Sequence, residues 1–146
     1  MALKILKVIW SFSLLGMLVV FMYVYASLPE KVVVSENSQT ITLSKETVFY
    51  IALVLIAVSN ALVFAVSRIY PEKDEDFKAW FYGMVACANL FFVIGLSFIS
   101  LYNSNEKYDF GRLGVIIYGS LGLLLMWATS WPVYRLAQRF FSKQPV

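Results

Sequence analysis

Few side chains in this sequence could carry catalysis or bind a metal. The 146 residues include no histidine and a single cysteine, Cys87. The lack of histidine excludes His-ligated haem, His-ligated zinc and a histidine general base. One cysteine cannot form an intramolecular disulfide, and thiolate metal clusters need several such ligands. We therefore predict no catalytic residue, no metal site and no cofactor, and a protein that is not an enzyme.

Two asparagines, Asn60 and Asn89, are the polar side chains best placed to interact inside the protein. Each lies near the middle of a long stretch without charged residues, where an amide without a partner is costly. We expect a mutual hydrogen bond between them, with a net value of about 0.6–2 kcal/mol. A ligand or ion contact at this pair is the alternative.

The spacing of the charged residues predicts the elements that carry these asparagines. Four stretches of 21–27 residues, 8–29, 47–67, 79–105 and 113–134, contain no Asp, Glu, Lys or Arg. A helix of about 20 mostly apolar residues crosses a bilayer, and an unpaired charge in hydrocarbon costs at least about 2.5–3.5 kcal/mol. We therefore predict an all-α integral membrane protein, a four-transmembrane-helix bundle in a single domain 1–146, with spans at about 4–26, 47–68, 78–102 and 111–134.

The overall composition agrees with a membrane protein. Hydrophobic residues make up 60% of the chain, charged residues 14%, and the mean hydropathy is +0.73, whereas soluble domains have about 25% charged residues. The first apolar stretch exceeds the 7–15 residues of a signal-peptide core, so we expect it to remain as a span. The basic residues lie at span ends rather than along one stripe, which argues against a nucleic-acid partner.

The Lys and Arg residues also predict an orientation. With the N-terminus in the cytoplasm, eight of them fall on the cytoplasmic side and four outside. Cytoplasmic loops carry the excess of Lys and Arg, so we expect both termini in the cytoplasm.

Small residues at helical spacing predict how the helices associate. Helices in lipid approach closely at small residues and through interhelical hydrogen bonds. We expect these faces to pack within one chain, with a homo-oligomer or partner-subunit seam as the alternative. The residues are Ala57, Ala61 and Ala65 in the second span, Gly83 and Ala86 in the third, and Gly111, Gly114 and Gly122 in the fourth.

Two segments outside the spans have recognisable patterns. The first outer loop, 28–46, has two runs rich in β-branched residues around a turn-like centre, so it is either a short β-hairpin or an extended linker. After Pro132, the tail 135–146 places Leu136 and Phe140 on one face and Arg135 and Arg139 on another. That pattern predicts a short amphipathic cytoplasmic helix in the headgroup layer.

The first outer loop also carries a family resemblance. The chain reads Leu28-Pro29-Glu30-Lys31-Val32 after the first span and Ser44-Lys45 before the second. Between Tyr25 and Tyr50 it resembles a group of bacterial membrane proteins with a Leu-Pro-x-x-apolar segment, a polar loop and a Ser-Lys pair, which includes the immunity protein against the sporulation-delay toxin. This loop lacks the His-Phe pair and the glycines that members usually carry. The resemblance implies a bacterial inner-membrane protein concerned with sensing or immunity.

Three functions are compatible with these patterns. The small size and the lack of catalytic groups favour an accessory or scaffolding subunit that presents helix faces and the outer loop to membrane-protein partner subunits. A sensor or immunity protein would instead bind a peptide or envelope component through loop 32–43. A small-molecule transporter or membrane enzyme would need a polar cavity around Asn60 and Asn89, and the charge-free spans give no sign of an ion relay.

Overall fold

The computed structural model describes residues 1–35, 40–70, 75–104 and 109–141, and within them the chain forms four long helices and two short strands. All four helices are long and apolar enough to cross a membrane, which confirms the prediction of four such segments. The elements in chain order are α1 (Ala2–Ser27), β1 (Lys31–Ser35), β2 (Ile41–Ser44), α2 (Lys45–Ile69), α3 (Glu75–Tyr102) and α4 (Phe110–Phe141).

Local chemistry sets both ends of α2. Ser44 caps the N-terminus, because its Oγ accepts a hydrogen bond from the backbone N–H of Thr47 at 3.1 Å, as serine does at helix starts. At the other end Tyr70 is extended, with φ −82° and ψ 133°. Tyr70 precedes Pro71 in the sequence, and a residue before proline is disfavoured in the helical conformation. Helix α2 therefore ends at Ile69.

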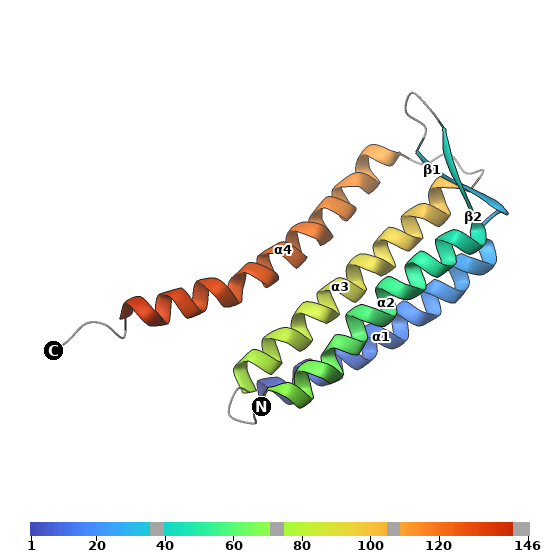
Figure 1. Ribbon diagram of the computed structural model, residues 1–146. Helices are drawn as coiled ribbons and strands as arrows, with labels where there is room; N and C mark the ends of the chain where they lie inside the picture. Colours follow the sequence, from blue (N-terminus) through green and yellow to red (C-terminus); the bar gives the residue numbers. More distant parts are fainter. Residues whose placement is uncertain (36–39, 71–74, 105–108, 142–146) are drawn as a thin grey trace.

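Helix α3 is the central element of the molecule. It packs against α1, α2 and α4, and it lies between α4 on one side and α1 with α2 on the other (Figure 1). The N-terminus and the last described residues of α4 lie at the end of the molecule opposite the two strands (Figure 1). We call the end with the strands the hairpin end, and the other the terminal end.

The buried core comes from three of the four helices together with Val32 of β1. One cluster near the hairpin end centres on Met17, Phe21 and Leu96, and a second near the terminal end centres on Trp10 and Val63. Neither cluster includes a residue of α4, and 6% of the apolar window of α4 is buried against 17–22% in the other helices. The bundle is therefore a three-helix core with α4 attached to the outer side of α3.

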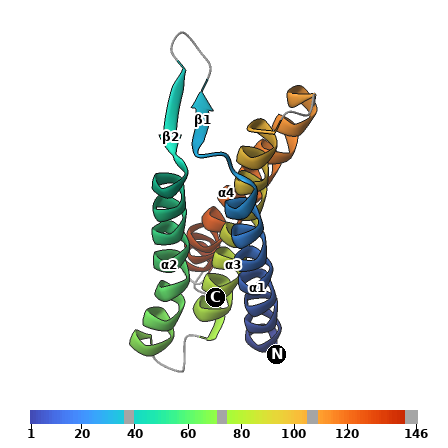
Figure 2. The same cartoon turned by 90° about the vertical axis from the view of Figure 1, so that its right-hand side faces the viewer.

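Strands β1 and β2 form an antiparallel hairpin above the ends of α1 and α2 (Figure 2). Lys31 pairs with Ser44 and Val32 with Leu43, and the register shifts between Val33 and Ser35. Loop 28–46 thus contains a hairpin and is not an extended linker. Residues 36–39, between the two strands, lie outside the described residues.

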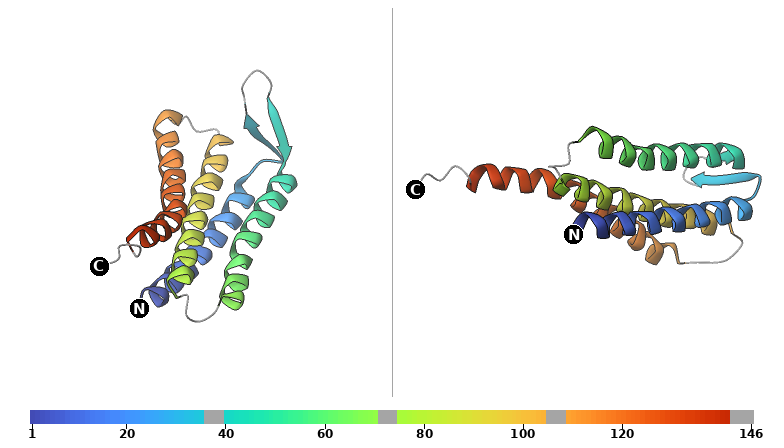
Figure 3. Two further views of the ribbon diagram at one scale, coloured as in Figure 1. Left: turned by 60° about the vertical axis from the view of Figure 1, so that its left-hand side comes forward. Right: turned by 90° about the horizontal axis from the view of Figure 1, so that it is seen from below.

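The expected amphipathic tail is not a separate helix. Helix α4 continues through Pro132 to Phe141, but its last part turns away from the direction of its first part (Figure 3). The right-hand view of Figure 3 shows this last part beyond the ends of the other helices. Proline lacks a backbone N–H and therefore removes one hydrogen bond from the helix, but here it does not end the helix. Residues 142–146 lie outside the described residues.

Candidate functional site

Asn60 and Asn89 form a reciprocal amide pair between α2 and α3. Asn60 Nδ2 donates to Asn89 Oδ1 at 2.9 Å, and Asn89 Nδ2 donates to Asn60 Oδ1 at 3.1 Å. Asn60 is 6% exposed and Asn89 is fully buried. The mutual hydrogen bond expected from the sequence is therefore present.

The pair belongs to a larger network that also includes α1. The indole Nε1 of Trp10 donates to Asn60 Oδ1 at 2.9 Å, and Asn89 Nδ2 donates to Ser13 Oγ at 3.0 Å. Sequence reasoning missed Trp10 and Ser13, because it does not fix the rotation of α1 relative to the asparagines. Their spacing of three residues, which places both on one face of a helix, was the available signal. The network joins all three core helices at one level.

Every side-chain amide nitrogen and oxygen of this network already has a partner. Asn60 Nδ2 donates to the carbonyl oxygen of Ile56 as well as to Asn89, and Asn60 Oδ1 accepts from both Trp10 and Asn89. Among the described residues, no buried side-chain nitrogen or oxygen lacks a partner. A polar ligand here would have to replace hydrogen bonds that already exist. The network therefore connects the three helices.

A second junction attaches α4 to α3. Trp80 Nε1 donates to the backbone oxygen of Trp127 at 2.8 Å, and Trp127 Nε1 donates to the backbone oxygen of Trp80 at 2.9 Å. A Cβ placed on Gly83 would collide with the indole ring of Trp127. Gly83 therefore permits the close approach of α4, as a small residue does at a helix interface in lipid. Ala86, the other small residue predicted on α3, is also buried.

The small residues predicted on α2 do not pack within the chain. Ala57, Ala61 and Ala65 are all exposed, whereas the buried residues of α2 include Ile56 and Val63. Lipid is as apolar as a protein core. Apolar composition therefore does not decide which face of α2 is buried, and large aliphatic side chains can form the interface while the alanines face outward. For this chain the alanine face remains uncovered.

The glycines of α4 also depart from the expectation. Gly111 is exposed, and Gly114 and Gly122 are half-buried. A Cβ on Gly122 would meet no atom within 4 Å, and one on Gly114 would meet Tyr118 of the same helix. These glycines therefore do not bring α4 close to another helix of this chain.

An apolar groove runs between α2 and α3 beneath the hairpin. Its volume is about 310 Å³. Gly95 lies in its wall, and a Cβ there would meet no atom within 4 Å, so the groove has room for larger groups. The lining residues are Val34 and Leu43 of the hairpin, Val48, Ile51, Ala52, Leu55 and Ile56 of α2, and Phe91, Phe92, Gly95, Leu96 and Ile99 of α3.

The remaining reactive groups do not gather at one place. Cys87 is a half-buried free thiol on α3. In the part of the chain that the structure describes, no three His, Cys, Asp or Glu side chains are grouped so as to hold a metal ion.

Comparison of the chain with protein-family models, with curated proteins and with solved structures finds no match in any of the three.

Proposed function

We propose that this protein is a non-catalytic accessory or scaffolding subunit of a larger complex in the plasma membrane of a bacterium, with both termini in the cytoplasm. The observation that carries the proposal is the apolar groove between α2 and α3. It is about 310 Å³ in volume, and the side chains of this chain leave it unfilled. We propose that an apolar transmembrane segment of a partner subunit packs into it.

The lining of the groove supports a helix partner rather than a polar ligand. All the lining side chains are apolar, and apolar helices associate in lipid through close packing. Val34 and Leu43 place the hairpin at one end of the groove, so a partner would touch both the helix faces and the loop. The polar groups of the core, by contrast, are engaged with one another, which gives a transported polar solute no support.

Filling the groove tests this proposal. Gly95→Leu adds a side chain into open space in the groove, and Gly16→Leu adds the same side chain to open space on α1. Both variants should fold with the thermal stability of the wild type in mild detergent. Gly95→Leu should lose a partner that the wild type and Gly16→Leu both retain on co-purification. Retention of every partner by Gly95→Leu, or a strictly solitary wild-type monomer, would overturn the proposal.

A photocrosslinker at Leu55 identifies the occupant directly. Leu55 lines the groove and is 50% exposed, so a benzophenone side chain at this position lies next to any bound segment. We expect adducts to map to an apolar segment of a different membrane protein. Adducts to a second copy of this chain would instead indicate a homo-oligomer. An Ala61→Leu variant tests in the same assay whether the exposed alanine face is used.

A sensor or immunity role is the second candidate, because Asn103, which directly follows α3, holds the hairpin in place. Asn103 Oδ1 accepts from the N–H of Val33 at 2.7 Å, and Asn103 Nδ2 donates to the oxygen of Val33 at 3.1 Å. Val34 and Ile41 are 50% and 54% exposed, so the hairpin presents apolar side chains from a fixed position. Deletion of residues 32–43 distinguishes the two candidate functions. Loss of peptide binding while the complex stays intact would favour the sensor or immunity role.

A further inference from the structure

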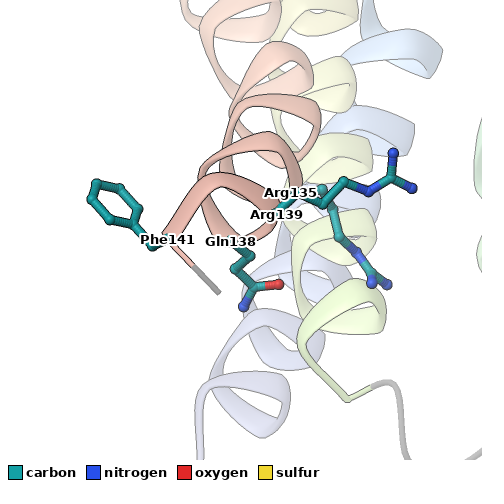
Figure 4. Close-up of a pocket in the computed structure, with 4 residues that line it drawn as sticks. All are labelled: Arg135, Gln138, Arg139 and Phe141. Atoms are coloured by element: carbon teal, nitrogen blue, oxygen red, sulfur yellow. The ribbon is translucent and has the colours of Figure 1, made fainter. Parts of the chain in front are cut away.

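The terminal end of α4 carries a basic surface that the proposed function does not use. An open hollow of about 710 Å³ is lined by Arg135, Gln138, Arg139 and Phe141 (Figure 4). Arg135 and Arg139 extend to the same side of α4, and Phe141 extends away from them. All four residues are exposed. Because the two arginines are four residues apart on one helix, their guanidinium groups belong to a single face.

No carboxylate pairs with the arginines of this face within the described part of the chain. The ion pair found there joins Arg112 to Asp109 near the hairpin end, with 3.4 Å between Nε and Oδ2. Neither Arg135 nor Arg139 lies within ion-pair distance of a described carboxylate. Their donors are therefore available to an anion from outside the chain.

An aromatic cluster next to the arginines indicates their depth relative to the membrane. The Arg135 guanidinium lies over the Trp131 ring, 5.0 Å from its centroid, and Trp131 stacks on Trp80 of α3 with 5.8 Å between centroids. Aromatic side chains of this kind gather at the level of lipid headgroups. The charge-free stretch 113–134 of α4 is about 33 Å long, close to the thickness of about 30 Å of a hydrocarbon core. The arginines therefore follow directly after the apolar span.

We propose that this face binds the phosphate of an anionic phospholipid headgroup. Two guanidinium forks on one side of a helix match the oxygen geometry of phosphate. The apolar side chains of the same segment, such as Leu136 and Phe140, are exposed, which suits contact with the acyl chains of the same lipid. Charge complementarity and the position at the span end favour a membrane lipid over a soluble anion.

Native mass spectrometry of the full-length protein tests the proposal, with equal amounts of phosphatidylglycerol and phosphatidylcholine as probes. The wild type should prefer phosphatidylglycerol. Arg135→Gln and Arg139→Gln should each lower that preference about fivefold, since one basic residue near an anionic surface contributes about that much. Arg112→Gln, at the other end of α4, should leave it unchanged. The lysine variants R135K and R139K keep the charge without the fork and should lose less than the glutamine variants.

Two outcomes would overturn the proposal. One is an unchanged preference for phosphatidylglycerol in the R135Q/R139Q double variant that elutes and melts like the wild type. The other is release of phosphatidylglycerol from the wild type by inorganic phosphate at equal concentration, which would show a site for soluble anions instead.

Discussion

Trp80 and Trp127 exchange hydrogen bonds across α3 and α4, each indole donating to the backbone oxygen of the other residue over 2.8 and 2.9 Å. Gly83, less than one turn along α3, leaves the space that the Trp127 ring occupies. The exchange matters because α4 contributes no residue to the two buried clusters of the core. This junction therefore contributes interhelical hydrogen bonds to a helix that adds no residue to those clusters.

The first prediction concerns this junction. Gly83→Ala would bring a methyl group into the indole ring of Trp127, and overpacking of this kind costs about 1–3 kcal/mol. We expect a lower free energy of unfolding in mixed micelles, measured by circular dichroism against increasing denaturing detergent. Gly119→Ala on α4 is the control, because its Cβ would meet no atom within 4 Å. Equal stability of the two variants would contradict the role assigned to Gly83.

The second prediction concerns the asparagine pair. Asn89→Leu removes the partner of one Asn60 donor and one Asn60 acceptor and leaves the Ser13 hydroxyl without its donor. We expect a loss of about 0.6–2 kcal/mol in the free energy of unfolding. The double variant N60L/N89L should lose less than the sum of the single variants, because it leaves fewer amides unpaired.

Ser120 provides the control for this experiment. Ser120 is buried, but its Oγ donates to Ile117 of its own helix. Ser120→Ala should therefore have a smaller effect than Asn89→Leu. Additive losses in the asparagine cycle would show that the two amides are not coupled.

The third prediction concerns the hairpin. Asn103→Ala removes both side-chain hydrogen bonds to Val33. We expect faster hydrogen exchange at the Val33 amide, measured by mass spectrometry on peptides that cover β1, with the exchange of α2 unchanged. Ser104→Ala is the matched control, since Ser104 Oγ bonds only locally, to Leu101. Equal exchange in both variants would mean that Asn103 does not hold the hairpin.

The fourth prediction concerns the inferred orientation. In a Cys87→Ser background, Thr40→Cys in the hairpin segment and Gln138→Cys near the end of α4 both place a thiol at an exposed position. A membrane-impermeant maleimide applied to intact cells should label Thr40→Cys directly and Gln138→Cys only after permeabilisation. The reverse pattern would indicate the opposite orientation. Labelling of both cysteines from outside would show that the two ends of the molecule do not lie on opposite sides of the membrane.

The sequence by itself predicted which segments form the long apolar helices. Charged residues are costly in hydrocarbon, so the gaps between Lys7 and Glu30 or between Arg112 and Arg135 mark helices with little dependence on the rest of the chain. The same reasoning predicted the amide pair, because Asn60 and Asn89 lie mid-span, where each needs a partner. It did not predict that α4 continues past Tyr134 to Phe141, since residues 135–141 are equally compatible with a separate interfacial helix.

Tertiary structure decided which face of each helix packs. In water an apolar stripe marks the buried side of a helix, but in lipid both sides are apolar and the stripe carries no such information. Ala57, Ala61 and Ala65 therefore looked like an interface and are exposed, while Gly83 became one because Trp127 lies against it. The position of Trp10 beside Asn60 likewise depends on how α1 is rotated, which is set by packing among three helices and not by the composition of any one of them.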